Sequence, residues 1–262
     1  MPLLAALAVA AGAWALRSFG VPAGQASQSE PHIVRTLRVD VLREFPHDPS
    51  AYTQGLLWWN DRLYESTGRY GESTLRRLDP ETGVVEKRVD IPQNLFGEGL
   101  ARVGDQLIML TWKAGRAVVF DLSTFERVRS FRYPGEGWGL CGDGARLLMS
   151  DGSETLTFRD PETFDPVDTV RVMLRGRPQT NLNELECVDG AVYANVWQHD
   201  YIVRIDPTSG RVTHQIDASG LLSRDEARGV DVLNGIAHNP ERDTFYITGK
   251  WWPKMFEVRF VE

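Results

Sequence analysis

A short phrase of sequence occurs five times along this chain of 262 residues. Each copy is a Gly-Leu or similar pair, and an apolar segment starts eight residues after its first member in four copies and ten residues after it in the fifth. The pairs begin at residues 55, 99, 139, 184 and 235, at intervals of 40 to 51 residues. A period of this length with several short strands per unit is typical of a β-propeller. The sequence therefore predicts an all-β, five-bladed β-propeller with four-stranded antiparallel blades.

A turn between the third and fourth predicted strands of a unit recurs with the same period. It reads Asp-Pro-Glu-Thr-Gly from Asp79, and related turns start at Asp121, Asp160 and Asp206. In such a turn Asp accepts backbone hydrogen bonds, Pro fixes φ and Gly adopts a positive φ. We interpret these aspartates as structural caps, and the turn as independent support for the repeat.

The beginning of the chain differs in composition from the rest. An almost wholly apolar run from Leu3 to Leu16 is followed by small residues, which is typical of a signal peptide. Arg17 lies after the apolar run and no basic residue precedes it, so an uncleaved N-terminal membrane anchor is the alternative. We expect an exported protein, periplasmic or secreted, in which residues 1–26 are the leader and residues 27–32 a linker.

The remaining residues, 33–262, form the predicted propeller domain. Its last unit, which starts at Asn234, has only three predicted strands. The alternating segment 33–42 supplies the missing strand in our interpretation, because a ring closed in this way leaves no open sheet edge. A closed ring has no structural need of a partner, so we expect a monomer.

Composition and residue spacing disfavour some classes of function. The formal net charge is −7 and the sequence pI is about 5.4, without a basic patch, which disfavours nucleic-acid binding. The five histidines and two cysteines show no metal-ligand spacing, so we predict no metal site. Cys141 and Cys187 are compatible with a disulfide in an exported protein, but a buried free thiol fits each position equally well, and we expect free thiols.

The slot directly before each repeated pair varies in chemistry, although the framework around it is constant. It holds Gln54, Glu98, Trp138, Asn183 and Asn234. The first strand of a propeller blade lines the central axis, so these residues form one ring in the predicted fold. Five residues beyond the start of each second strand lies another set, Gly68, Trp112, Gly152, Trp197 and Lys250. Because the second strand is antiparallel to the first, both sets are expected at the same face of the molecule.

Together the two sets combine one carboxylate, one ammonium, three amides and three indoles. Tyr52 and Phe96, each two residues ahead of a slot, extend the aromatic wall. Indoles form an apolar pocket in which a few polar groups orient a small ligand, and a carboxylate there has a raised pKa suited to acid–base catalysis. The competing interpretation is that the tryptophans only pack the blades together and that Glu98 and Lys250 form a buried ion pair. The variety of residues in one repeated slot favours a functional site.

Five motifs resemble those of plant-type glutaminyl cyclases, a family with bacterial members. They are Tyr52-Thr53-Gln54-Gly55-Leu56, Phe96-Gly97-Glu98-Gly99-Leu100, Asn183-Glu184-Leu185-Glu186, Leu233-Asn234-Gly235-Ile236-Ala237 and Thr248-Gly249-Lys250-Trp251-Trp252-Pro253. The resemblance extends from about Phe45 to Val258. It implies a five-bladed propeller that converts the N-terminal glutamine of peptides or proteins to pyroglutamate with loss of ammonia. It also implies that no cofactor is required, although a structural calcium ion is compatible with it.

The resemblance assigns roles residue by residue. Glu98 is similar to the catalytic carboxylate of the family, acting as general acid and base, and Asn183 and Lys250 are similar to its polar partners. The substrate-binding residues implied in the same way are Gln54, Tyr52, Phe96, Trp112, Trp138, Trp197 and Asn234. Tyr52 departs from the phenylalanine that is usual in the family.

Two other functions are compatible with the sequence. A non-catalytic propeller would capture exported peptides or other ligands on the same face. A calcium-dependent lactonase-like hydrolase is the second alternative, but such propellers have six blades and a carboxylate-rich metal site. Release of ammonia from a peptide that begins with glutamine, measured with and without a chelator, separates the three functions.

Overall fold

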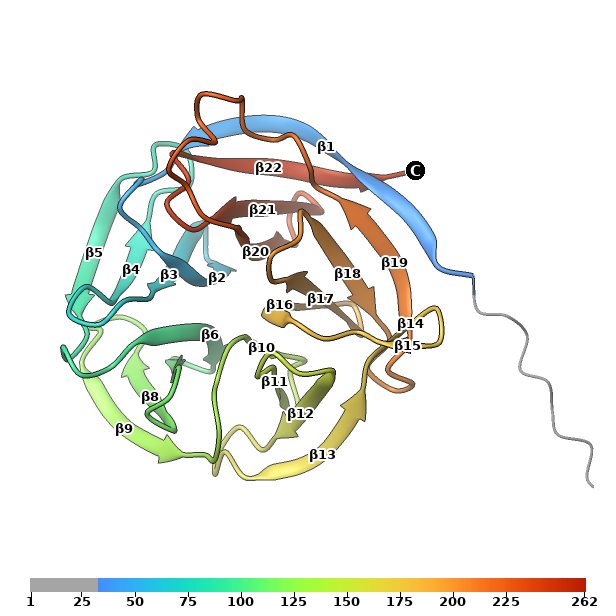
Figure 1. The fold of residues 1–262 in the computed structure, drawn as a ribbon. Helices are drawn as coiled ribbons and strands as arrows, with labels where there is room; N and C mark the ends of the chain where they lie inside the picture. Colours follow the sequence, from blue (N-terminus) through green and yellow to red (C-terminus); the bar gives the residue numbers. More distant parts are fainter. Residues whose placement is uncertain (1–32) are drawn as a thin grey trace, which may run out of the picture. The chain divides into compact units, whose positions relative to one another are not determined.

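The computed structural model describes residues 33–262, and the predicted leader and linker lie outside the described part. The described chain is all-β, with strands β1 to β22 and no helix. Accordingly, no helix within residues 33–262 is long and apolar enough to cross a membrane. The sheets are arranged around a common centre in a propeller-like manner (Figure 1).

Three four-stranded antiparallel sheets follow one another along the chain (Figure 1). The first contains β2 (Thr53–Trp59), β3 (Arg62–Thr67), β4 (Thr74–Leu78) and β5 (Val85–Asp90). The second contains β6 (Gly97–Val103), β7 (Gln106–Thr111), β8 (Arg116–Asp121) and β9 (Arg127–Arg132). The third contains β10 (Leu140–Gly142), β11 (Leu147–Met149), β12 (Thr155–Arg159) and β13 (Pro166–Arg171). Each repeated pair of the sequence lies in or beside the inner strand of its sheet.

The remaining large sheet has eight strands and joins two further units of the repeat. Its strands, in spatial order, are β16 (Leu182–Val188), β17 (Ala191–Val196), β18 (Tyr201–Ile205), β19 (Val212–Asp217), β1 (Arg35–Pro46), β22 (Lys254–Val261), β21 (Thr244–Gly249) and β20 (Leu233–Asn239). Strand β1 is antiparallel to β22, where the sequence places the missing strand of the last unit. It also pairs in parallel with β19, which the repeat did not predict. A short hairpin of β14 (Met173–Leu174) and β15 (Arg177–Pro178) was not predicted either.

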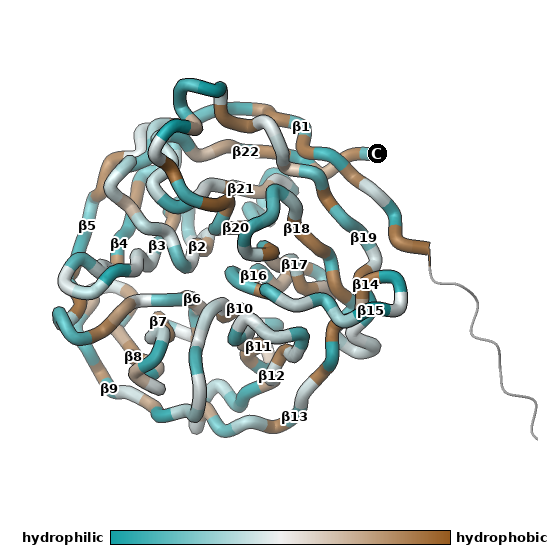
Figure 2. Tube along the Cα trace, in the orientation of Figure 1, coloured by the Kyte–Doolittle hydropathy of each residue, from teal (hydrophilic) through white to brown (hydrophobic). Residues whose placement is uncertain are grey.

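Burial follows the position of a strand in its sheet. The inner strand β2 and its neighbour β3 are mostly buried, whereas the outer strand β9 is exposed along most of its length. Figure 2 shows a similar contrast between the hydrophobic β18 and the more hydrophilic β19 next to it. Apolar side chains also join neighbouring sheets: one cluster contains Leu57 and Leu75 of the first sheet with Leu100 and Met109 of the second. Burial of apolar surface between sheets, at about 25 cal/mol per Å², is the main stabilising contribution to such a fold.

The recurring Asp turns have the predicted caps. Asp79 Oδ1 accepts hydrogen bonds from two backbone N–H groups at 3.1 and 2.9 Å. The equivalent aspartates, Asp121, Asp160 and Asp206, cap their turns in the same way. Glycine takes the positive-φ position in two of the turns, but Phe125 (φ 58°) and Phe164 (φ 65°) take it in the others. Both phenylalanine rings are buried, and this burial offsets the cost of the left-handed conformation.

Glycines of the repeated pair let the inner strands of neighbouring sheets approach closely. A Cβ added to Gly55 or Gly99 would lie 2.5 Å from a backbone nitrogen of the next sheet, so no larger residue fits without a shift. The fourth copy carries Glu184 in place of this glycine. Its carboxylate accepts hydrogen bonds from the backbone N–H groups of Leu56 at 3.3 Å and Ile236 at 2.8 Å. Glu184 therefore ties β16 to both β2 and β20.

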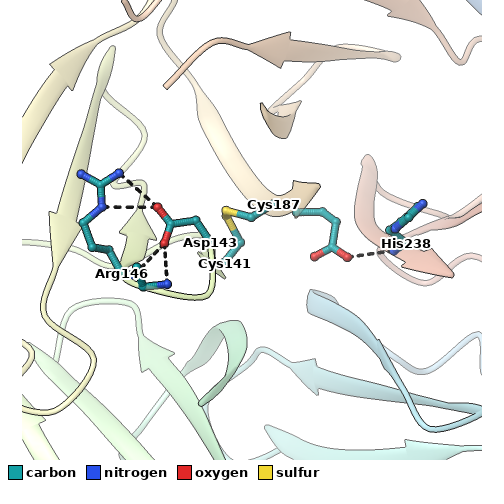
Figure 3. The surroundings of a disulfide bond; sticks show 7 residues. Cys141, Asp143, Arg146, Cys187 and His238 are labelled. Carbon is teal, nitrogen blue, oxygen red and sulfur yellow. Dashed lines mark hydrogen bonds and ion pairs between the residues drawn. A yellow bond between two sulfur atoms is a disulfide. The ribbon is translucent and has the colours of Figure 1, made fainter. Parts of the chain in front are cut away.

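The expectation of free thiols was wrong, because Cys141 and Cys187 form a disulfide (Figure 3). Cys141 lies on β10 and Cys187 on β16, and these two inner strands pack against each other. Their Cα atoms are 5.5 Å apart, which is within the usual range for a disulfide. The bond joins neighbouring sheets across a sequence separation of 46 residues. The spacing of two cysteines in a repeat does not show whether their side chains face each other.

We expect the double variant Cys141→Ala/Cys187→Ala to lose roughly 2–5 kcal/mol of unfolding free energy, because the disulfide restricts the unfolded chain. Urea denaturation measures this loss. Wild-type protein treated with a reductant is the control and should approach the stability of the variant. Equal denaturation midpoints for the oxidised wild type, the reduced wild type and the variant would contradict a bond that contributes to stability.

Candidate functional site

A cavity of about 310 Å³ contains residues from both predicted sets. The residues that line it are Tyr52, Gln54, Phe96, Glu98, Trp112, Trp138, Asn183, Trp197 and Lys250. They come from the inner strands β2, β6 and β16, from the ends of the second strands of several sheets, and from the segment before β10. The structure thus brings together residues that are up to about two hundred positions apart in the sequence, as the antiparallel geometry of the repeat predicts.

Three members of the two sets do not line this cavity. Asn234 is fully buried, and its side-chain nitrogen donates to the backbone oxygen of Thr53 at 3.0 Å and to Gln54 Oε1 at 3.4 Å. It therefore helps to position the side chain of Gln54. Gly68 and Gly152 provide space instead, since a Cβ at these positions would collide with the rings of neighbouring cavity residues.

The variable slot coincides with an irregularity in strand pairing. The register of the inner strand shifts between Gly97 and Leu100, on either side of Glu98, and between Leu182 and Leu185, on either side of Asn183. The pairing of β2 and of β20 shifts at the same place in the repeat. Such irregularities redirect side chains and are frequent beside active sites. They explain how one slot can point its side chain into a cavity while the rest of the strand remains in the core.

Glu98 is a buried carboxylate with little hydrogen bonding. Glu98 is 4% exposed, and Gln54 Nε2 donates a hydrogen bond to its Oε1 at 3.3 Å. Burial raises the pKa of Glu98 well above its usual value. The positive charge of Lys250 partly opposes this shift, and the negative charge of Glu136 adds to it. A carboxyl group with a raised pKa inside a cavity is suited to taking up and returning a proton.

Lys250 directly follows β21, and a backbone hydrogen bond fixes its position. Its N–H donates to the carbonyl of Val232 at 2.9 Å, and its Nζ lies 4.9 Å from the ring centroid of Tyr52. Burial lowers the pKa of Lys250, although Glu98 and Asp231 favour the charged form. The cavity therefore contains an acid and a base whose pKa values are both displaced towards neutrality.

Aromatic rings form most of the cavity wall. The indoles of Trp138 and Trp197 meet edge to face, with ring centroids 5.7 Å apart. Phe96 packs against Trp112 at 5.5 Å and against Tyr52 at 6.2 Å. Such a wall excludes water and strengthens the electrostatic interactions of the few polar groups inside.

Two carboxylates that no sequence motif indicates hold this wall in place. Glu136 Oε2 accepts hydrogen bonds from the indole nitrogens of Trp112 at 2.6 Å and Trp138 at 3.0 Å. Asp231 Oδ2 accepts a hydrogen bond from the Tyr52 hydroxyl at 2.9 Å. Both carboxylates lie in connecting segments outside the repeated landmarks. Only the proximity of Glu136 to Trp138, two positions later, could have suggested its role.

An aromatic cavity with one deeply buried carboxylate, in an all-β propeller-like fold, defines a small-ligand site suited to acid–base chemistry. A sequence profile described as "Glutamine cyclotransferase" matches residues 13–260. A protein of Arabidopsis thaliana named "Glutaminyl-peptide cyclotransferase" is 41% identical over 242 residues, covering 90% of this chain and 76% of the relative. The crystal structure of Myxococcus xanthus glutaminyl cyclase is similar, with a TM-score of 0.79 and 40% sequence identity, over 87% of this chain and 99% of that one. The chain belongs to the glutamine cyclotransferase family.

Proposed function

We propose that this protein is an enzyme that converts the N-terminal glutamine of peptides and proteins to pyroglutamate with release of ammonia. The observation that carries this proposal is the buried Glu98, which shares an aromatic cavity with Asn183 and Lys250. Membership of the glutamine cyclotransferase family supports it. The cavity volume of about 310 Å³ is at the lower end for small-molecule sites and suits one glutamine residue in a folded conformation.

The reaction is an intramolecular acyl transfer. The α-amine nitrogen attacks the side-chain amide carbon of the same glutamine, a C–N bond forms, and a tetrahedral intermediate results. Glu98 accepts a proton from the attacking amine and returns it to the departing nitrogen, so the original amide C–N bond breaks and ammonia leaves. The cavity contributes by holding the side chain folded back on the amine, which makes the attack effectively unimolecular.

Charge in the intermediate develops on the former amide oxygen. We place Asn183 and Lys250 on that side, because an amide N–H and an ammonium both stabilise an oxyanion and because Lys250 would repel a protonated substrate amine. The indoles enclose the glutamine side chain and exclude water, which would otherwise hydrolyse the amide. Gln54, supported by Asn234, fixes the Glu98 carboxylate.

The finer description of the fold is also a proposal. We infer five blades, with β1 as the outer strand of the last blade and the ring closed between that blade and the first. The antiparallel pairing of β1 with β22 supports this. So does the contact between β2 and β20, the inner strands of the first and last blades.

Export to the periplasm or the exterior, with or without a membrane anchor, remains a proposal that rests on residues 1–26. A monomer without nucleic-acid partners is proposed on the closed ring and the acidic composition. We also propose that catalysis needs no metal ion. Calcium prefers six to eight oxygen ligands, whereas the cavity offers one carboxylate and two amides beside the cationic Lys250. Among residues 33–262, no cluster of three or more potential metal-binding side chains occurs.

Ammonia release from a dipeptide that begins with glutamine tests the proposed function. We expect release to continue at the same rate in the presence of a chelator. Absence of release, together with saturable peptide binding, would support the non-catalytic alternative. Loss of release on chelation would instead indicate a metal enzyme.

Substitution of Glu136 tests whether the orientation of the cavity's indoles matters for the reaction. We expect Glu136→Ala to lower kcat/KM by about tenfold, since two indole N–H groups lose a charged acceptor. Glu136→Gln keeps one oxygen that can accept from both indoles and should remain close to the wild type near the optimum pH. Steady-state kinetics with a glutaminyl dipeptide measure both variants. Glu86→Ala, which removes a carboxylate of the outer strand β5 that pairs with Arg62 and Arg77, is the control. An Ala variant as active as the Gln variant would contradict this positioning role.

A further inference from the structure

Two more hollows lie in sequence beside the cavity: the second shares residues with the cavity, and the third shares a residue with the second. The second hollow, of about 280 Å³, is lined by Tyr52, Arg69, Tyr70 and Phe96, and the third, of about 500 Å³, by Pro49, Ser50, Arg69, Glu72, Gly229 and Trp251. Tyr52 and Phe96 line both the catalytic cavity and the second hollow. Arg69 lines both the second and the third. The second hollow therefore borders the catalytic cavity, and the third borders the second.

The chemistry of the substrate requires an exit from the catalytic cavity for the rest of the peptide. Cyclisation uses the α-amine and the side chain of the first residue, and both must lie inside the catalytic cavity. The remaining substituent on the α-carbon is the carbonyl group that leads to the second residue. That carbonyl and the chain beyond it must leave through the mouth of the cavity.

The walls of the second hollow are aromatic and partly exposed. The ring of Tyr70 is edge to face with that of Phe96, with centroids 5.5 Å apart, and Tyr70 is 52% exposed. Tyr52, which lines this hollow, packs against Trp251 of the third hollow, with ring centroids 4.9 Å apart. An exposed tyrosine beside a buried aromatic wall offers an apolar contact to a passing side chain.

Arg69 places a positive charge beside both the second and the third hollow. Its guanidinium carbon lies 5.2 Å from the ring centroid of Trp251. Its ion pair with Glu72, at 3.2 Å, joins two side chains that are 44% and 65% exposed, so the pair is weak and screened by solvent. Arg69 thus remains available to attract an acidic group or to repel a basic one.

Several hydrogen bonds hold the loop that carries Arg69. Arg69 has a φ of 88°, which is uncommon for a residue other than glycine. Its carbonyl accepts hydrogen bonds from Ser73 N–H at 2.9 Å and Ser73 Oγ at 2.7 Å, and Gly71 N–H donates to the carbonyl of Gln93 at 3.1 Å. Local strain held by such contacts is a feature of pre-organised binding loops.

We propose that the second and third hollows bind the residues that follow the N-terminal glutamine. This inference rests on the proposed function and adds which second residues of the peptide the enzyme favours. The second residue lies against Phe96 and Tyr70, where an aromatic or large apolar side chain is favoured. A lysine or arginine in that place is disfavoured because Arg69 repels it.

The test compares three substrates: glutamine amide, Gln-Phe-amide and Gln-Lys-amide. For the wild type we expect kcat/KM for Gln-Phe-amide to exceed that for glutamine amide by about tenfold or more, the usual worth of a well-formed apolar subsite. Tyr70→Ala should reduce this ratio severalfold. Arg69→Ala should raise kcat/KM for Gln-Lys-amide relative to Gln-Phe-amide. Arg88→Ala, which removes an exposed arginine paired with Asp90 on the outer strand β5, is the matched control and should leave all ratios unchanged.

The outcomes separate this inference from the proposed function. Similar kcat/KM values for the three substrates, or ratios unaffected by Tyr70→Ala and Arg69→Ala, would overturn the assignment of the hollows while leaving the cyclase activity established. Failure of the wild type to release ammonia from any of the substrates would overturn the proposed function itself. Far-ultraviolet circular dichroism identifies a variant that has failed to fold, and Tyr70→Gln and Arg69→Gln then replace the alanine variants.

Discussion

Glu98→Gln is expected to lower kcat by about 10²–10⁴-fold, the usual contribution of a general acid–base group, while the protein stays folded. Glutamine has nearly the shape of glutamate and keeps an acceptor for Gln54, but it cannot take a proton from the attacking amine. Because burial raises the pKa of Glu98, the native carboxylate is costly to keep charged, and its replacement by a neutral amide should not unfold the chain.

Ammonia release under saturating substrate measures this loss, and thermal unfolding measures the folded state. Glu86→Gln is the matched control, because Glu86 is a carboxylate of the outer strand β5 that pairs with Arg62 and Arg77 far from the cavity. It should retain wild-type turnover. Near-wild-type turnover by Glu98→Gln would show that Glu98 is not the general base of the reaction.

Much of the arrangement could be predicted from periodicity. The interval between repeated pairs predicts inner strands that return to the same centre, and the antiparallel second strand brings its end to the same side. That reasoning places Glu98 and Asn183 from one set, and Trp112 and Lys250 from the other, around one cavity, where the structure has them. Strand direction and repeat length are enough to place these residues, and both are encoded locally.

Features that depend on the register between sheets could not be predicted. Cys141 and Cys187 lie at slightly different distances after their repeated pairs, and only the packing of β10 against β16 shows that they meet. The shift in strand pairing around Glu98 could not be predicted either, because no sequence motif indicates one extra residue in a strand. The role of Glu136 could not be predicted because its partners are indole N–H groups, whose directions depend on side-chain rotamers.

Activity should fall at both low and high pH. The interval between these two decreases should be narrower than the interval between the ordinary pKa values of glutamate and lysine. The general base must be deprotonated, so activity falls as pH decreases through the raised pKa of Glu98. The oxyanion partner must be protonated, so activity falls as pH increases through the lowered pKa of Lys250. The α-amine of the substrate also titrates, but its effect is common to every variant of the enzyme.

Lys250→Met should lower kcat by about 10²–10³-fold, since it removes a preorganised donor to the oxyanion from a site of low dielectric constant. It should also move the acidic limb to higher pH, because the charge of Lys250 lowers the pKa of Glu98. Glu136→Gln should move the same limb in the opposite direction, because the charge of Glu136 raises that pKa. Profiles of kcat against pH for the three proteins measure both shifts. An acidic limb that stays in place in both variants would show that Glu98 is not the group that titrates, even if Lys250→Met is nearly inactive.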